Sequence, residues 1–296
     1  MVHLLLATIL PLAAAIALGF LWVKLGRPFD TATLGRLGSD IGMPCVALST
    51  LANANVPLAA FADSALAAFL CMVALGLLGA VVLNLAGLRL KTYLPSVTWG
   101  NASFLGIPIS LYAFGQPGLG YAVAFSAVSL VFNSIFSQAI AVGAANLREV
   151  LRNPLIYAIA IGVFLRLMDT TLPDCAQRSL SLLGGITVPV MLMMVGASIA
   201  RIRAVSIGRA AVFSLLRAVG GGAVGCAIGV SLGLSPVALH VLILQAAMPV
   251  AVLSYVFAER WNNEPDEVAS LVAVSTWSAA ASVPLMLVLM MGSHAG

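Results

Sequence analysis

The stretch that decides the fold is GNASFLGIPIS, residues Gly100–Ser110, which lies between the apolar runs LPSVTW and LYAF. With these flanks, the segment Leu94–Phe114 is about long enough to cross a bilayer as a helix. Its middle nevertheless contains residues that are unfavourable in a lipid-exposed helix, namely Asn101, Ser103, Gly106 and Pro108. Backbone groups freed by such residues are tolerated at membrane depth only where they line a cavity. The stretch therefore predicts a membrane segment that breaks near Gly106–Pro108.

The composition of the whole chain indicates an integral membrane protein. Of its 296 residues, 61% are hydrophobic and only 8% are charged, and the mean hydropathy is +1.10. Soluble domains carry about 25% charged residues. The small net charge of +4 is informative about the orientation of loops and does not indicate nucleic-acid binding. The four cysteines show no CxxC spacing and are interpreted as apolar fillers, so no metal site is expected.

Breaks at glycine, proline and charged clusters divide the chain into ten apolar segments. They cover about residues 3–23, 37–57, 64–88, 95–114, 120–144, 153–168, 180–200, 207–234, 236–257 and 268–291. The first segment has no basic residue ahead of it within this sequence and is interpreted as a retained membrane span. The sequence thus predicts an all-α membrane protein with ten transmembrane helices.

Basic residues alternate between the loops that join these segments. The odd-numbered loops hold eleven of them, which are Lys24, Arg27, Arg36, Arg89, Lys91, Arg148, Arg152, Arg201, Arg203, Arg209 and Arg260. The even-numbered loops hold two, Arg166 and Arg178. Because cytoplasmic loops are enriched in lysine and arginine, the odd loops are expected in the cytoplasm. The prediction is a multi-pass protein of the cell membrane with both termini outside the cytoplasm.

The two halves of the chain resemble each other. LPLAAAIALGF at Leu10–Phe20 aligns with NPLIYAIAIGV at Asn153–Val163, and the tripeptide AVS recurs at 127–129 and 273–275. Three pairs of prolines align in the same order, namely Pro11 with Pro154, Pro44 with Pro189 and Pro108 with Pro249. An odd number of spans per copy inverts the second copy in the membrane, as in many secondary transporters. Residues 1–146 and 147–296 are therefore predicted to be two inverted five-helix repeats.

Three stretches resemble the auxin efflux carrier family, which includes the plant PIN-FORMED carriers. NASFLGIP is similar to the fourth-span motif of that family, and RNPLIYAIAIGVFL is similar to its sixth span. QAAMPVAVLSYVFAERWNNEPDEVASLVAVST resembles its ninth span, the following loop and its tenth span. The resemblance implies a fold like that of the bile-acid/sodium symporters. In it, scaffold helices 1, 2, 6 and 7 hold a core of helices 3–5 and 8–10, and helices 4 and 9 cross.

The residues beside the two expected breaks are the candidate site. Asn101 matches a position that the resemblance links to carboxylate binding, and Gln245 occupies the corresponding stretch of the second half. Each could instead form an interhelical hydrogen bond. Ser103 could contact substrate or cap a half-helix, and Ser49 in the second span faces a similar choice. A structural role in the crossover is expected of Gly106, Pro108 and Pro249.

Arg217 is a basic residue well inside an expected span, about 15 Å from Ile207 along an ideal helix. It could be a counter-charge for an anion. The interpretation favoured from the sequence is a side chain that snorkels toward the basic loop containing Arg201, Arg203 and Arg209.

The function expected from the resemblance is a secondary transporter for small organic anions such as mono- or dicarboxylates, because bacterial relatives are associated with malonate and malate. An elevator-type movement at the midplane crossover is expected. The alternative is a sodium-coupled symporter of the bile-acid type, although every Asp and Glu lies at a span end or in a loop. No HExxH or GxSxG motif is present, which argues against an enzyme. Cofactors are not expected; a coupling ion, Na⁺ or H⁺, and a homodimer remain open.

Overall fold

The computed structural model describes residues 2–52, 57–137, 139–140, 151–201, 206–252, 254–255, 258 and 261–292. Within these residues the elements are helices, and no strand is formed. The all-α prediction is therefore confirmed. Three of the basic loop residues, Arg148, Arg203 and Arg260, lie outside the described residues, as does the boundary at 146/147 between the expected repeats.

The first half of the chain contains α1 (Val2–Lys24), α2 (Thr31–Arg36), η1 (Leu37–Gly42), α3 (Met43–Ala52), α4 (Leu58–Leu85), α5 (Leu90–Thr98), η2 (Ala102–Gly106), α6 (Ile107–Phe132) and η3 (Asn133–Ser137). The second half contains α9 (Pro154–Leu167), α10 (Asp174–Gly185), α11 (Thr187–Arg201), α12 (Ile207–Leu215), η4 (Leu216–Gly220), α13 (Gly221–Ser231), α14 (Pro236–Ala246) and α16 (Pro265–Gly292). The η elements are π-helical turns that join helices into longer stretches.

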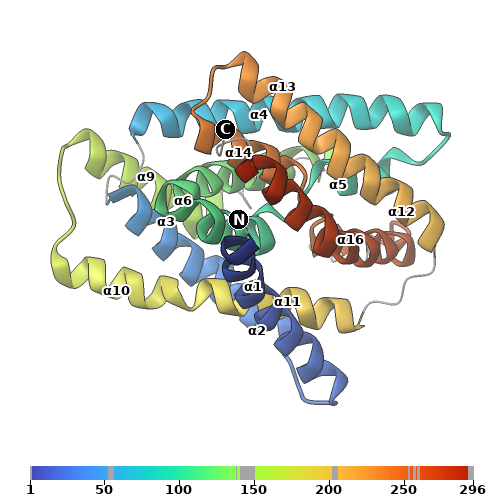
Figure 1. Ribbon diagram of the computed structural model, residues 1–296, viewed down its shortest axis with the longest axis horizontal. Coiled ribbons are helices and arrows are strands. Elements are labelled where there is room, and N and C mark those ends of the chain that lie inside the picture. The colour runs from blue at the N-terminus through green and yellow to red at the C-terminus, as the bar shows by residue number, and fades with distance from the viewer. Residues whose placement is uncertain are drawn as a thin grey trace.

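Five helical stretches within the described residues are long and apolar enough to cross a membrane. They are Leu58–Leu85, Ala102–Phe132, Asp174–Arg201, Ile207–Ser231 and Pro265–Met290. Shorter apolar helices cover Leu10–Lys24, Pro154–Leu167 and Pro236–Ala246. In Figure 1, α4 runs across the upper part of the molecule and α10 with α11 across the lower part, with α6 between them.

Local sequence explains where two of these elements begin or bend. Asn153 caps α9, because its side-chain oxygen accepts a hydrogen bond of 2.9 Å from the Leu155 backbone nitrogen, and Pro154 occupies the first turn. Gly115 has a φ of 66° inside α6, which only glycine adopts without strain. The kink at Gly115 divides α6 between the expected fourth and fifth segments.

One set of helices combines α1, α2, α3, α9, α10 and α11. In it α1 packs along α11, and α3 packs against α9 and α10. The α1–α11 contact is close, since a methyl group at Gly19 or Gly196 would overlap the backbone of the other helix. Gln177 on α10 donates a hydrogen bond of 2.8 Å to Ser49 on α3. Apolar packing and polar contacts thus hold this set together.

A second set combines α4, α5, α6, α12, α13, α14 and α16. Here α4 packs against α5 and α6, α12 against α16, and α13 against α14. A polar cluster joins three of these helices: Arg209 donates to the Tyr93 hydroxyl at 2.8 Å and lies 3.3 Å from Glu267. An ion pair of 2.8 Å between Arg89 and Glu264 lies in the segments before α5 and α16.

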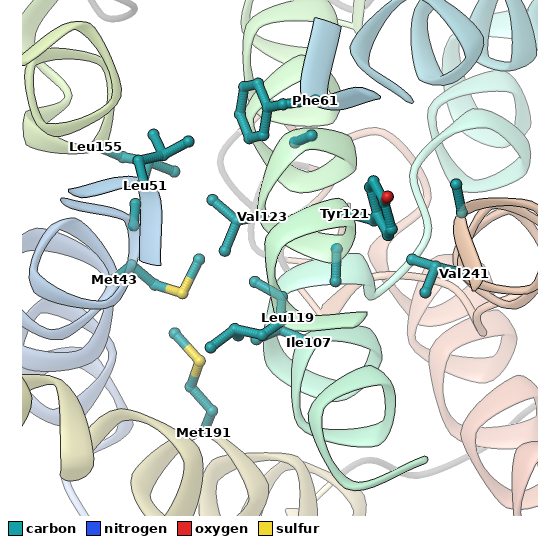
Figure 2. Packing of buried hydrophobic residues seen from close by; sticks show 14 residues of the cluster. Met43, Leu51, Phe61, Ile107, Leu119, Tyr121, Val123, Leu155, Met191 and Val241 are labelled. Atoms are coloured by element: carbon teal, nitrogen blue, oxygen red, sulfur yellow. The ribbon is translucent and has the colours of Figure 1, made fainter. Parts of the chain in front are cut away.

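The two sets meet along an apolar seam. Figure 2 shows Met43 and Leu51 of α3 and Leu155 of α9 on one side, facing Leu119 and Val123 of α6 on the other. All five side chains are buried. Such contacts are non-directional, so they stabilise the seam without fixing one register through hydrogen bonds.

Candidate functional site at two interrupted helices

The fourth expected segment is interrupted between α5 and η2. α5 ends at Thr98, the backbone of Trp99 is extended, and helical structure resumes at Ala102. The sequence predicted the break near Gly106–Pro108, but these residues lie within the helix that follows the break. The reason is the π-turn η2, in which the Ile107 N–H bonds to the Ala102 carbonyl. This wider turn accommodates the proline without ending the helix.

The second interruption lies after α14, at Ala247–Ala251, and contains Pro249. The two interruptions contact each other through the backbone, as an antiparallel bridge between Gly100 and Val250. The Asn101 N–H donates to the Pro249 carbonyl at 2.7 Å, and the Ala251 N–H donates to the Trp99 carbonyl at 3.0 Å. Groups that lost their helical partners thus satisfy one another.

A small cavity of about 70 Å³ lies beside the first interruption. Its walls come from both sets of helices and are formed by Ser39, Met43, Trp99, Gly100, Asn101, Ser103, Phe104, Ser126, Ser129, Leu130, Asn153, Leu155, Met191, Ala251 and Val252. All of these side chains are neutral, and the space is large enough to hold ordered water.

Two buried polar atoms of the cavity walls have no hydrogen-bond partner within the described residues. They are Nδ2 of Asn101, whose side chain is 3% exposed, and Oγ of Ser126. Other wall residues are engaged: the Ser129 hydroxyl accepts from Asn133 at 3.2 Å, and Asn153 caps α9. Because buried polar groups are normally paired, the two unpaired atoms indicate a place for water or a polar ligand.

The structure brings two of the four predicted binding residues together. Asn101 and Ser103 both line the cavity, whereas Gln245 and Ser49 do not. Gln245 is fully buried between the interrupted helices, where its Nε2 lies 3.4 Å from the Ser110 hydroxyl. Gly106 makes room for it, since a methyl group there would overlap the Gln245 amide. Ser49 lies on α3 and accepts the hydrogen bond from Gln177.

Sequence reasoning missed several polar residues of the cavity, above all Ser126, Ser129 and Asn153. Ser129 belongs to the repeated tripeptide AVS, and Asn153 belongs to the stretch RNPL that opens the sixth segment. Both motifs were visible as repeats or helix starts. Nothing local in the sequence showed that they would face the break in the fourth segment.

The snorkelling interpretation of Arg217 is wrong. Its side chain is only 5% exposed and lies at the junction of the two interruptions. The Nε donates to the Met248 carbonyl at 2.7 Å, and Nη1 donates to the Val97 carbonyl. The guanidinium thus finds hydrogen-bond acceptors inside the protein, at backbone carbonyls beside the two interruptions, and does not extend to a polar surface.

Comparison with known proteins places this geometry in a family. The family model described as "Membrane transport protein" matches residues 137–287, which is half of the chain. The chain belongs to this membrane transport family. The matched region runs from η3 into α16 and includes the second interruption and Arg217. The protein is therefore a multi-pass membrane transporter of the auxin efflux carrier family and not an enzyme.

The individual proteins that this chain resembles are also named as transporters or carriers. An uncharacterized transporter of Methanothermobacter thermautotrophicus is 26% identical over 94% of this chain and 96% of its own length. An uncharacterized transporter of Methanocaldococcus jannaschii is 26% identical over 70% of this chain and 72% of its own. Auxin efflux carrier component 1 of Arabidopsis thaliana is 32% identical over 42% of this chain, but the alignment covers 21% of that carrier. The family resemblance predicted from the sequence is confirmed.

Proposed function

We propose that this transporter carries small organic anions, namely mono- or dicarboxylates, through the cavity beside Asn101. The observation that carries the proposal is the unpaired Nδ2 of Asn101, buried in the wall of a cavity next to a helix start. Amide N–H groups donate hydrogen bonds to carboxylates without adding a fixed charge. A neutral donor suits a carrier, because it binds an anion and can also release it.

The backbone supports the same ligand chemistry. The helix that begins at Ala102 presents its N-terminus to the cavity, where Ser103 and Phe104 form part of the wall. The first N–H groups of a helix have no intrahelical partner and carry a partial positive charge. Among the described residues, no carboxylate lines the cavity to oppose an anion.

The proposed mechanism is elevator-type alternating access within two inverted five-helix repeats, 1–146 and 147–296. The first set of helices, which corresponds to expected helices 1, 2, 6 and 7, is the scaffold, and the second set is the moving core. Two observations support this division: the polar contacts Gln177–Ser49 and Arg209–Tyr93 each lie within one set, and the seam between the sets contains an apolar cluster. A movement of the two sets relative to each other would enlarge the cavity, because its walls come from both sets.

The proposed location is the cell membrane, with the odd loops in the cytoplasm. Residues of odd loops contact one another, as in the Arg89–Glu264 pair and the 3.3 Å contact of Arg201 with Thr31. Cys175 is exposed in the first turn of α10 and belongs to the sixth loop expected from the sequence, which is an even loop. In a variant that lacks the other three cysteines, an impermeant maleimide should label Cys175 on intact cells. Labelling that requires permeabilised cells would reverse the proposed orientation.

Uptake into proteoliposomes tests the function directly. Radiolabelled malonate, malate and acetate are offered with and without a sodium gradient, and empty liposomes give the background. We expect saturable uptake of at least one of these acids, abolished by competing unlabelled acid. Uptake that requires a sodium gradient would favour the symporter alternative. Saturable uptake of neutral or cationic solutes alone would contradict an anion carrier.

A further inference from the structure

Arg217 connects the two interrupted helices from a third helix. It lies in η4, between α12 and α13, and reaches the Met248 carbonyl through Nε at 2.7 Å and the Val97 carbonyl through Nη1. Val97 lies in the last turn of α5, and Met248 lies just past the end of α14. One guanidinium therefore binds the last turn of α5 and the segment that directly follows α14.

The C-terminal end of a helix carries a partial negative charge. The last carbonyls of a helix have no intrahelical partner, and the helix dipole places a partial negative charge there. In transporters with broken helices, such carbonyls and C-terminal half-helix ends coordinate the coupling cation. We propose that Arg217 is a tethered cation that occupies this place, so that transport needs no Na⁺ bound at the crossover. The proposal rests on the transport function proposed above and specifies its coupling.

The surroundings of the guanidinium fit this role. Gly100, whose backbone bridges to Val250, lies against it, and a methyl group at Gly100 would overlap Nη2 of Arg217. Nη2 itself is buried without a hydrogen-bond partner within the described residues. Gly100, inside the first interruption, thus has no side chain that would overlap the guanidinium beside the bridge.

The charge of Arg217 is not neutralised by an ion pair within the described part of the chain. The two salt bridges found there are Arg89–Glu264 and Arg209–Glu267. The guanidinium therefore places a net positive charge next to Gly100. Gly100 and the following residue, Asn101, both line the cavity. A fixed positive charge in a low-dielectric region favours a nearby anion. Arg217 thereby supplies both effects that a coupling cation would supply: it holds the half-helix ends and it attracts the anion.

Chemical rescue tests whether the place is a cation site. We measure thermal unfolding of the full-length protein in detergent for wild type and for Arg217→Ala. The variant should unfold about 5–10 °C lower, because two carbonyls lose a charged donor. Millimolar guanidinium chloride should restore more than half of this loss, and choline chloride of equal ionic strength should restore none. The matched control is Arg209→Ala, which removes an arginine from a partly exposed pair and should gain nothing from guanidinium.

Two outcomes would overturn the tethered cation. One is a failure of guanidinium to stabilise Arg217→Ala, and the other is equal stabilisation of Arg209→Ala. Should Arg217→Ala fail to fold, Arg217→Lys and Arg217→Met test the same question, namely whether this position requires a cation. Only the lysine variant keeps one. The lysine variant should retain more thermal stability than the methionine variant, and equal values would contradict the proposal.

Transport measurements test whether uptake depends on sodium. Wild-type proteoliposomes should take up the labelled acid at the same rate with a sodium gradient and with choline in its place, and uptake should respond to an imposed membrane potential. Sodium-dependent uptake would refute the replacement of a coupling cation. The thermal arms use no substrate, so a failure to transport carboxylates would leave their result intact and would count against the proposed function alone.

Discussion

The two interrupted helices meet each other, yet their surroundings differ. At the first interruption, Asn101 lies in the wall of a cavity and keeps an unpaired amide nitrogen. At the second, Gln245 is sealed between helices and approaches the Ser110 hydroxyl. The backbone of the second break is also bound more fully, because the Val250 N–H donates to the Ser275 hydroxyl at 3.1 Å.

This difference shows that matching positions in a repeated sequence need not share a chemical role. Gln245 sits against Gly106, on the helix that follows the first interruption, so it holds the crossing in place. Asn101 follows Gly100, which forms the backbone bridge to Val250, and it also lines the cavity. Ligand binding is thus expected from the first half of the site, and mechanical support from the second.

The largest effect is expected at Asn101. Asn101→Ala removes a hydrogen bond to a charged ligand, which contributes about 1.5–3 kcal/mol, so affinity for the transported acid should fall about 10- to 150-fold. Asn101→Asp should weaken binding further, because it opposes a carboxylate with a negative charge. Calorimetry or scintillation proximity on folded protein measures both. Near-wild-type affinity in both variants would remove the cavity from the binding step.

A smaller effect is expected at Ser126, whose hydroxyl lines the same cavity as Asn101 and has no hydrogen-bond partner among the described residues. A hydroxyl that contacts the ligand directly or through one water contributes about 0.5–1.5 kcal/mol. Ser126→Ala should therefore reduce affinity about 2- to 10-fold. Thermal stability should not fall, since the change removes a buried unpaired group. A variant that binds as wild type but unfolds at a lower temperature would assign Ser126 to packing instead.

The apolar segments and the presence of two breaks were predictable from the sequence, because apolar length and proline or glycine content are local properties. The exact place of the first break was not. Gly106 and Pro108 indicated an interruption, but the wider π-turn η2 accommodates the proline within the helix. The helix is interrupted at Trp99–Asn101 instead. A shift of this kind depends on the Gly100–Val250 bridge, a contact between distant parts of the chain.

The composition of the cavity was less predictable than its position. Asn101 and Ser103 stand beside the break in the sequence, whereas Ser126 and Asn153 reach the cavity only through the packing of other helices. Arg217 shows the same limit. Its position inside a span was evident, but whether it reaches the membrane surface or a pair of free carbonyls is decided by the tertiary structure.

The smallest effect on binding is expected at Gln245, and it tests the comparison most sharply. Gln245→Met keeps the length of the side chain and removes a 3.4 Å hydrogen bond together with an unpaired carbonyl oxygen. The change leaves the buried Ser110 hydroxyl without this long hydrogen bond but also removes a buried unpaired oxygen, so thermal stability should fall only slightly and substrate affinity should stay close to wild type. Ser49→Ala is the matched control, since Ser49 bonds to Gln177 away from the cavity. A loss of affinity in Gln245→Met as large as that in Asn101→Ala, with Ser49→Ala unaffected, would make the two halves of the crossover chemically equivalent.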